Sequence, residues 1–244
     1  MLERFRLMLR LEEKEGLKKK LVKHIAITTE GIEFWAKKNN KTLEQSYKKS
    51  FVIIRDIISL IIRSNIPLIT FYISPKEIKR DESFNIFVDE LVSFLNNMKG
   101  SELLHKNKAK VSALGKWYDM PGKAVEAVKS IIDETKDYDC FFLNFCINYE
   151  GQEEIADACR LIARQIKADK IDVDSITKET IKENIYSSYF LPPDLIINNG
   201  LQRNNSGLLL WDSIYSEMHF TGKPFPDFTK QDFLNIIKKY YTSK

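Results

Sequence analysis

Residues 24–31 read HIAITTEG, an apolar and β-branched run that ends in a carboxylate and a glycine. Such a run predicts a strand buried on both faces, with a loop at its carboxyl end. Similar runs recur along the chain at residues 68–74, 110–114, 140–148 and 195–197. The segments between them have apolar residues with helical spacing, so the chain alternates strands with helices. These helices are expected at 43–64, 82–98, 122–134, 152–168 and 229–241, with short helical turns in 171–190.

Apolar strands that alternate with helices indicate a parallel sheet covered on both faces. We therefore expect a single α/β domain over residues 22–244, with a central, mostly parallel sheet of about six strands flanked by helices. Residues 1–21 predict a separate amphipathic helix, which either packs on the domain or lies on a membrane surface. Ligands of such sheets bind beyond the carboxyl ends of the strands, so the loops at that edge should surround one site. These loops follow Thr29, Ser74, Asn148 and Ile197.

The composition narrows the functional classes. The net charge is +4, which is too weak to indicate nucleic-acid binding without a concentrated basic patch. The cysteines, three in number, lie in apolar runs and are expected to be buried thiols in a reducing compartment. We find no signal peptide and no apolar run of the ~18 residues that a membrane span needs, so we expect a cytoplasmic protein. Peripheral contact with a membrane through the amino-terminal helix stays open.

Several longer motifs occur in a fixed order. They are HIAITTEGIEFWAKK at 24–38, NYEG at 148–151, PDLII at 193–197, LLWDSIYSEMHF at 209–220 and FPDF at 225–228. In this order they resemble the cis-prenyltransferase family, typified by undecaprenyl diphosphate synthase, over roughly residues 22–241. The resemblance implies Mg²⁺-assisted condensation of isopentenyl diphosphate onto an allylic diphosphate. It also implies an apolar tunnel for the growing chain, between two helices and the sheet. The large side chains expected there either line the tunnel or fill it; they are Phe51, Phe84, Phe87 and Phe94.

The resemblance also assigns candidate site residues. Catalytic roles fall on Glu30, Ser74 and Asn148. Substrate binding falls on Gly31, Trp35, Lys37, Arg80, Asn198, Arg203 and Asn204. Mg²⁺ would be held by Glu30 and Glu217. For Trp35, a place in the core is the simpler explanation, because buried tryptophans usually pack there.

The chain departs from the family pattern where charge matters most. Glu33 and Phe34 stand where the family has the Gly-Arg pair that cradles phosphate, and Leu43 and Tyr47 replace an arginine and a histidine further on. Asn198 and Asn204 stand where the family has two arginines. An amide can donate a hydrogen bond, but it carries no charge and no bidentate fork. We therefore expect a degenerate active site.

Two functions fit this pattern, and the sequence leaves open whether the chain is an enzyme. The first is an atypical transferase that acts on a prenyl diphosphate, by a short-chain transfer or a cyclisation, and does not make long polyprenyl chains alone. The second is a non-catalytic protein that pairs with a competent cis-prenyltransferase paralogue or binds a polyprenyl lipid. By resemblance we expect a dimer, either a homodimer or a heterodimer with such a paralogue.

Overall fold

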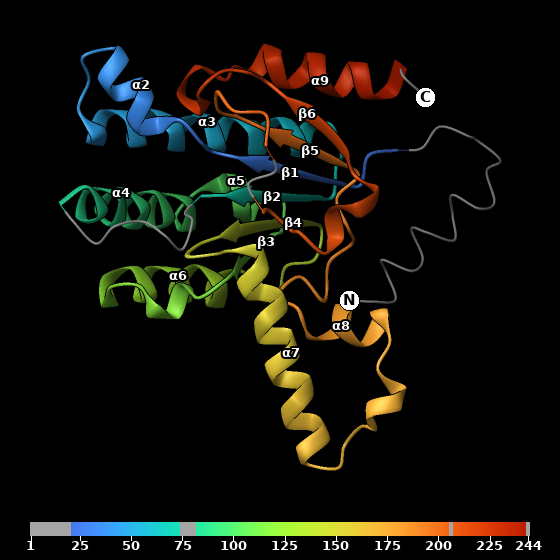
Figure 1. The fold of residues 1–244 in the computed structure, drawn as a ribbon. Coiled ribbons are helices and arrows are strands. Elements are labelled where there is room, and N and C mark those ends of the chain that lie inside the picture. The colour runs from blue at the N-terminus through green and yellow to red at the C-terminus, as the bar shows by residue number, and fades with distance from the viewer. Residues whose placement is uncertain (1–20, 74–81, 205–206, 243–244) are drawn as a thin grey trace.

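A computed structural model describes residues 21–73, 82–204 and 207–242 (Figure 1). The predicted helix over residues 1–21 lies outside this part of the chain, apart from Leu21. Two predicted site residues, Ser74 and Arg80, also lie outside it. None of the helices described is long and apolar enough to cross a membrane.

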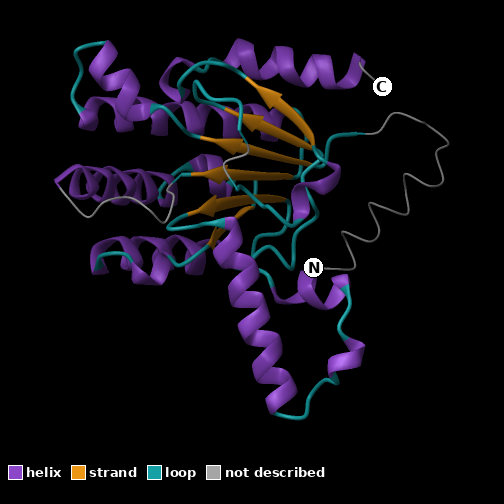
Figure 2. Ribbon diagram, in the orientation of Figure 1, coloured by secondary structure: helices purple, strands orange, loops and turns teal. Residues whose placement is uncertain are grey.

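Six strands form one sheet, in the order β3-β4-β2-β1-β5-β6, and every neighbouring pair is parallel (Figure 2). The strands are β1 His24–Thr28, β2 Leu68–Tyr72, β3 Ala109–Leu114, β4 Phe141–Cys146, β5 Leu195–Asn198 and β6 Glu217–Phe220. The predicted single α/β domain with a parallel sheet of about six strands is confirmed. The sequence did not predict β6, because this edge strand is short and only partly buried and so lacks an apolar run.

The α-helices of the described residues are α2 Ile32–Lys38, α3 Leu43–Arg63, α4 Glu82–Lys99, α5 Glu102–His105, α6 Gly122–Thr135, α7 Gly151–Lys167, α8 Lys178–Asn184 and α9 Lys230–Thr242. Short 3₁₀ turns are η1 Trp117–Asp119, η2 Val173–Ser175, η3 Asp212–Tyr215 and η4 Phe225–Asp227. Helices α3, α4, α6 and α9 pack their apolar sides on one face of the sheet (Figure 1). The other face is covered mainly by loop residues, which include Tyr186, Phe190, Leu208 and Leu209.

Local sequence explains why α3 begins where it does. The Thr42 hydroxyl accepts a hydrogen bond from the Gln45 amide at 3.1 Å, and the Gln45 side chain accepts one from the Thr42 amide at 3.3 Å. This reciprocal capping satisfies two amides that the helix cannot bond internally and contributes about 1 kcal/mol. The helix then buries Ile54, Ile57 and Ile61 almost completely against the sheet.

The cysteines differ from the prediction. Cys146 is buried within β4, but Cys140 and Cys159 are exposed. Cys140 precedes β4, and Cys159 lies on the outer side of α7, whereas its neighbours Ala158 and Ile162 are buried on the inner side. Apolar neighbours in the sequence therefore did not determine whether a cysteine is buried.

A buried polar row crosses the sheet beneath the loop residues. His24 Nδ1 lies 2.6 Å from the carbonyl oxygen of Leu191, so this nitrogen carries the proton and donates. His24 Nε2 then accepts from the Thr70 hydroxyl at 2.8 Å, and Thr70 Oγ1 accepts from the Asn144 amide at 3.3 Å. Burial lowers the pKa of the His24 imidazole to about 4, against the opposing hydrogen bond to Leu191.

This lowered pKa predicts acid sensitivity. Between about pH 6.5 and pH 4 the unfolded chain binds a proton at His24 that the folded chain excludes, so stability falls as the pH falls through that window. The loss should reach roughly 3 kcal/mol at its lower end. Urea unfolding at a series of pH values should show it, and His24→Gln should flatten the curve in this window. An unchanged pH dependence in that variant would contradict the assignment.

Candidate active site

The loops that follow β1 and β5 are joined at the carboxyl edge of the sheet. The Asn199 amide donates to the Thr28 hydroxyl at 2.8 Å, and the Asn199 side chain donates to the Thr28 carbonyl at 2.9 Å. The segment before α9 closes against both loops: the Gly200 amide donates to the Lys223 carbonyl, and the Phe225 amide donates to the Glu30 carbonyl, each at 2.8 Å. Asn199 is absent from the residues that the sequence assigned, although it lies only two residues after the predicted strand 195–197.

Glu30 lies at this junction. A Cβ atom added to Gly200 would lie 3.0 Å from Glu30 Oε2 and 3.4 Å from Glu30 Cβ, so the Glu30 side chain rests against the Gly200 backbone. Gly31 has φ +81° and would place a Cβ 2.8 Å from the Cβ of Pro224. Contact and backbone conformation therefore both require a glycine at position 31, whereas at Gly200, with φ +117°, the backbone conformation favours it and a Cβ would crowd the Glu30 carboxylate. The predicted residues Glu30 and Gly31 do lie where ligands of parallel sheets bind.

Asn198, the last residue of β5, is 2% exposed, and neither its Nδ2 nor its Oδ1 has a hydrogen-bond partner within the described chain. Its side chain shares the sheet face of Ile196, because alternate residues of a strand point the same way. Such an amide loses its hydration without compensation, at a cost of about 1–3 kcal/mol. The sequence identified this position, but it could not show that the side chain is buried and unpaired.

Helix α2 begins directly after Gly31. Glu33 and Phe34 are exposed, whereas Trp35 is buried and its Nε1 donates to Asp227 at 2.6 Å. The Lys49 ammonium lies 4.3 Å from the centre of the Trp35 ring. Trp35 thus fastens α2 to α3 and η4 and has the structural role that the sequence left open. Lys37 lies in the last turn, about 7.5 Å along the helix axis from Ile32.

The comparisons with known proteins identify the family. The model of a family described as "Putative undecaprenyl diphosphate synthase" matches residues 29–244. This chain belongs to the cis-prenyltransferase family.

Relatives in three organisms illustrate the likeness. The chain is 30% identical to the tritrans,polycis-undecaprenyl-diphosphate synthase (geranylgeranyl-diphosphate specific) of Thermoplasma volcanium, over 89% of this chain and 85% of that protein. It is also 30% identical to an isoprenyl transferase of Thermotoga maritima, over 91% and 94%. In fold it resembles the crystal structure of lavandulyl diphosphate synthase from Lavandula x intermedia in complex with dimethylallyl diphosphate. That match has a TM-score of 0.85 at 23% identity and covers 90% of this chain and 95% of the other.

The resemblance assigns Mg²⁺ to both Glu30 and Glu217. Within one chain, however, these two residues do not lie together. Glu217 is the first residue of β6 and pairs with Leu195, the first residue of β5. Glu30 instead follows the last residue of β1, at the opposite ends of the parallel strands. The joint Mg²⁺ site expected from the sequence is therefore not formed by a single chain, because strand register separates its two carboxylates.

The donor set at Glu30 limits what metal could bind. Mg²⁺ prefers oxygen ligands and is commonly held by one or two carboxylates together with substrate phosphates. No three Asp, Glu, His or Cys side chains gather as metal ligands in the described ranges. The residues therefore fit an ion that arrives with a diphosphate, with Glu30 as its protein ligand, and they do not fit a preformed metal site.

The remaining predicted residues are dispersed. Asn148 has φ 49° and its side chain donates to the Lys116 carbonyl at 2.8 Å, so it ties the loops after β4 and β3 together. Lys116, which the sequence did not single out, forms ion pairs with Glu153 at 2.6 Å and with Asp157 at 3.2 Å. Arg203 and Asn204 are exposed on the loop after β5, where Asn204 donates to Gln202.

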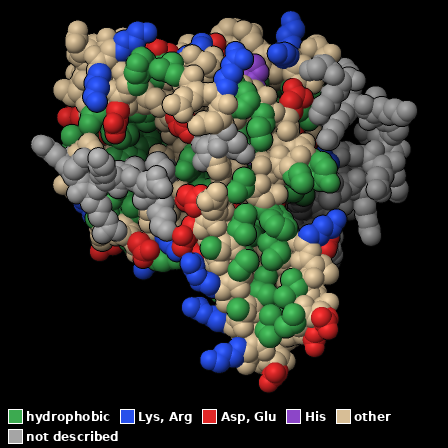
Figure 3. All heavy atoms as spheres, in the orientation of Figure 1, with side chains coloured by type: hydrophobic (Ala, Val, Ile, Leu, Met, Phe, Trp, Pro, Cys, Tyr) green, Lys and Arg blue, Asp and Glu red, His purple; other side chains and the backbone are tan. Residues whose placement is uncertain are grey.

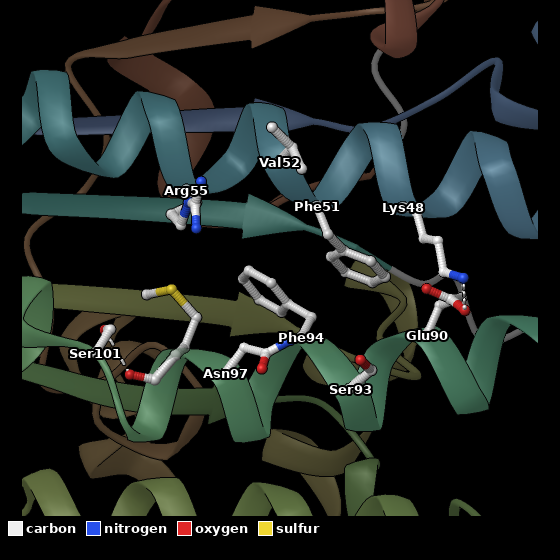
Figure 4. Close-up of a pocket in the computed structure, with 10 residues that line it drawn as sticks. Lys48, Phe51, Val52, Arg55, Glu90, Ser93, Phe94, Asn97 and Ser101 are labelled. Carbon is white, nitrogen blue, oxygen red and sulfur yellow. Dashed lines mark hydrogen bonds and ion pairs between the residues drawn. The ribbon is translucent and has the colours of Figure 1, made fainter.

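Helices α3 and α4 border a solvent-open cleft with a volume of about 360 Å³ (Figure 4). Phe51 and Phe94 point toward one another across it and stack, with ring centres 4.6 Å apart and an interplanar angle of 15°. Phe94 also meets Phe145 of β4 edge to face at 5.8 Å. All the lining residues come from the two helices and Ser101; besides the stacked rings they are Lys48, Val52, Arg55, Glu90, Ser93, Asn97 and Met98. Buried aromatic rings thus occupy the layer between this cleft and the sheet.

The unpaired amide of Asn198 yields a stability prediction. Asn198→Leu keeps the branched shape of the side chain and removes the uncompensated polar group, so the free energy of unfolding should rise by about 1 kcal/mol or more. Asn199→Leu is the matched control: it removes the side-chain bond to the Thr28 carbonyl and the one accepted from the Thr221 hydroxyl, and should lower stability by about 2 kcal/mol. Urea denaturation of both variants tests this. If Asn198→Leu is as damaging as Asn199→Leu, the Asn198 amide has a partner after all.

Proposed function

We propose that this chain acts on one short prenyl diphosphate at the carboxyl edge of the sheet and does not make long polyprenyl chains by itself. The aromatic packing between α3, α4 and the sheet carries this proposal. A long prenyl chain needs a continuous apolar channel that excludes water. Here Phe51 and Phe94 are each only 6% exposed, and they stack where the resemblance implies the tunnel. Long product would have to displace them.

The charges around Glu30 support a weaker hold on diphosphate than the family pattern implies. Asn198 and Asn204 carry no charge, and Glu33 adds a negative charge at the start of α2. Lys223, whose carbonyl bonds Gly200, directs its ammonium to Asp232 at 2.8 Å. A cation 4 Å from a phosphate oxygen gains about 4 kcal/mol at an effective dielectric constant of about 20, so each missing cation matters.

Within this proposal, Glu30 is the residue that binds the Mg²⁺ ion of a Mg²⁺–diphosphate complex. A bound Mg²⁺ neutralises charge on a departing diphosphate. The buried Asn198 amide lies at the same edge of the sheet and supplies one donor and one acceptor that the protein leaves unused. The curated relatives are named for undecaprenyl diphosphate synthesis or isoprenyl transfer, which supports a prenyl diphosphate as the substrate class.

Product length tests the proposal. With geranyl or farnesyl diphosphate, radiolabelled isopentenyl diphosphate and Mg²⁺, the unaltered chain should give short product or none. Phe94→Ala removes one ring of the stack and should shift any product toward longer chains, with Phe94→Leu as a milder variant that preserves folding. Phe233→Ala, a buried phenylalanine of α9, is the control for general destabilisation. Abundant long polyprenyl product from the unaltered chain would overturn the proposal.

A second candidate, a partner subunit, is favoured by an exposed apolar surface. Figure 3 shows hydrophobic side chains gathered over α7 and the segments beside it. We define the α7–η3 surface by Leu161, Val173, Tyr189, Ile214 and Tyr215. Tyr189 and Tyr215 are each 89% exposed and Ile214 is 74% exposed. The two loops that carry them are joined, since the Ser187 hydroxyl donates to Asp212 at 2.6 Å. Exposed apolar side chains that gather in this way mark protein–protein contact, and we propose that this surface joins two subunits.

Light scattering during gel filtration tests this surface. The unaltered chain should elute with twice the mass of one chain, or as a complex with a co-expressed paralogue. Ile214→Glu and Tyr215→Glu should reduce that mass to one chain, because a buried unpaired charge opposes association. Leu234→Glu, which places the same charge on the exposed side of α9, should not. A monomeric unaltered chain that captures no paralogue would contradict the proposal.

A further inference from the structure

The outward side of α2 and the turn after it combine exposed cations with an exposed aromatic ring. Phe34 is 43% exposed, and Lys37, Lys38 and Lys41 are all exposed. Residues 33–41 hold these three lysines and one glutamate, a net charge of +2 and half of the chain's +4. A concentration of charge this local is the kind of basic patch that the overall composition does not predict.

Structural requirements do not account for these lysines. Across the described chain, none of the three forms an ion pair, whereas neighbouring Lys48 pairs with Glu44 and lies 3.7 Å from Glu90. Lys37 and Lys38 suit the carboxyl end of a helix, but Lys41 lies beyond that end. A phenylalanine left nearly half exposed likewise contributes little to the core. Trp35 and Ala36, on the opposite side of the same helix, already provide its packing.

This surface lies at the rim of the candidate active site. Helix α2 begins one residue after Gly31, at the rim of the candidate active site, and Figure 1 shows it at an outer corner of the molecule beyond β1. Its lysines lie in the last turn of α2 and in the loop that follows. A surface at the rim that is basic and carries one aromatic ring matches an anionic bilayer, where lysines meet lipid phosphates and an aromatic ring enters the interface.

We propose that Phe34, Lys37, Lys38 and Lys41 form a docking surface for a membrane that contains anionic lipids. Docked in this way, the rim of the site faces the lipid phase into which an apolar prenyl product or a polyprenyl lipid partitions. The inference goes beyond the proposed function, because it concerns adsorption of the protein in the absence of any prenyl diphosphate. Glu33 carries the opposite charge, and Glu44 is paired with Lys48. The three lysines therefore make the net charge of the surface positive.

Vesicle co-sedimentation of the full chain tests the proposal. The unaltered protein should bind vesicles of phosphatidylcholine mixed with phosphatidylglycerol, bind pure phosphatidylcholine vesicles much less, and dissociate as salt is raised. The variant with Lys37→Gln, Lys38→Gln and Lys41→Gln should bind the mixed vesicles about ten-fold or more weakly. Phe34→Ser should also weaken binding, and its remaining binding should be more sensitive to salt. All four side chains are exposed, so these variants are expected to fold.

A charge-matched control separates location from net charge. Lys129→Gln, Lys167→Gln and Lys170→Gln remove the same charge from exposed positions on and near α6 and α7, and this variant should bind like the unaltered chain. Equal weakening by both triple variants would overturn the docking surface, as would full vesicle binding by the α2 variant. If the α2 variant keeps vesicle binding but loses binding of inorganic diphosphate in calorimetry, the lysines serve the substrate and the membrane proposal fails. None of these results depends on product length, so they leave the proposed reaction to its own test.

Discussion

The close approach of the loops after β1 and β5 determines where every other part of the candidate site lies. Two glycines make it achievable: a side chain at Gly31 would collide with Pro224, and one at Gly200 would crowd the Glu30 carboxylate. The bonds between Asn199 and Thr28 hold the loops at this separation. Because α2 begins directly after Gly31, the same contact fixes the start of α2 and the rim that it forms. A shift of either loop would move Glu30, Asn198 and α2 together.

The sequence predicted the sheet well because its four central strands, β4, β2, β1 and β5, are largely buried on both faces and are therefore mostly apolar. It missed β6 for the same physical reason: an edge strand that is half solvated has no such run. Helix α3 was predicted by its periodicity and confirmed with a capping box at Thr42. The burial of the three cysteines was wrong for Cys140 and Cys159, since burial depends on which side of an element faces the core, and neighbouring apolar residues do not fix that.

Within the site, the sequence located Glu30 and Gly31 correctly at the carboxyl edge, because a loop after a parallel strand can lie nowhere else. It could not place Glu217, whose position depends on the register between β5 and β6, a tertiary property. Nor could it show that the Asn148 side chain is already bonded to Lys116, or that Phe51 and Phe94 stack on one another. Contacts between segments far apart in the chain decide each of these, and local pattern carries no information about them.

The pattern of retained and changed motif residues has a physical basis. His24, Trp35 and Asp194 match the family motifs, and each side chain has a partner inside the protein: Leu191 and Thr70, Asp227, and the amides of Lys23 and His24.

Two changed positions, Leu43 and Tyr47, pack into or against the core, but three others have none of these internal ties. Phe34 is nearly half exposed, Asn198 is buried without a partner, and Asn204 bonds only its neighbour Gln202 within the described residues. A residue whose partners belong to the protein is retained because it stabilises the fold. A residue whose partner is a ligand is retained only while that ligand binds there. For these residues, the division between retained and changed positions therefore follows the presence or absence of a partner within the protein.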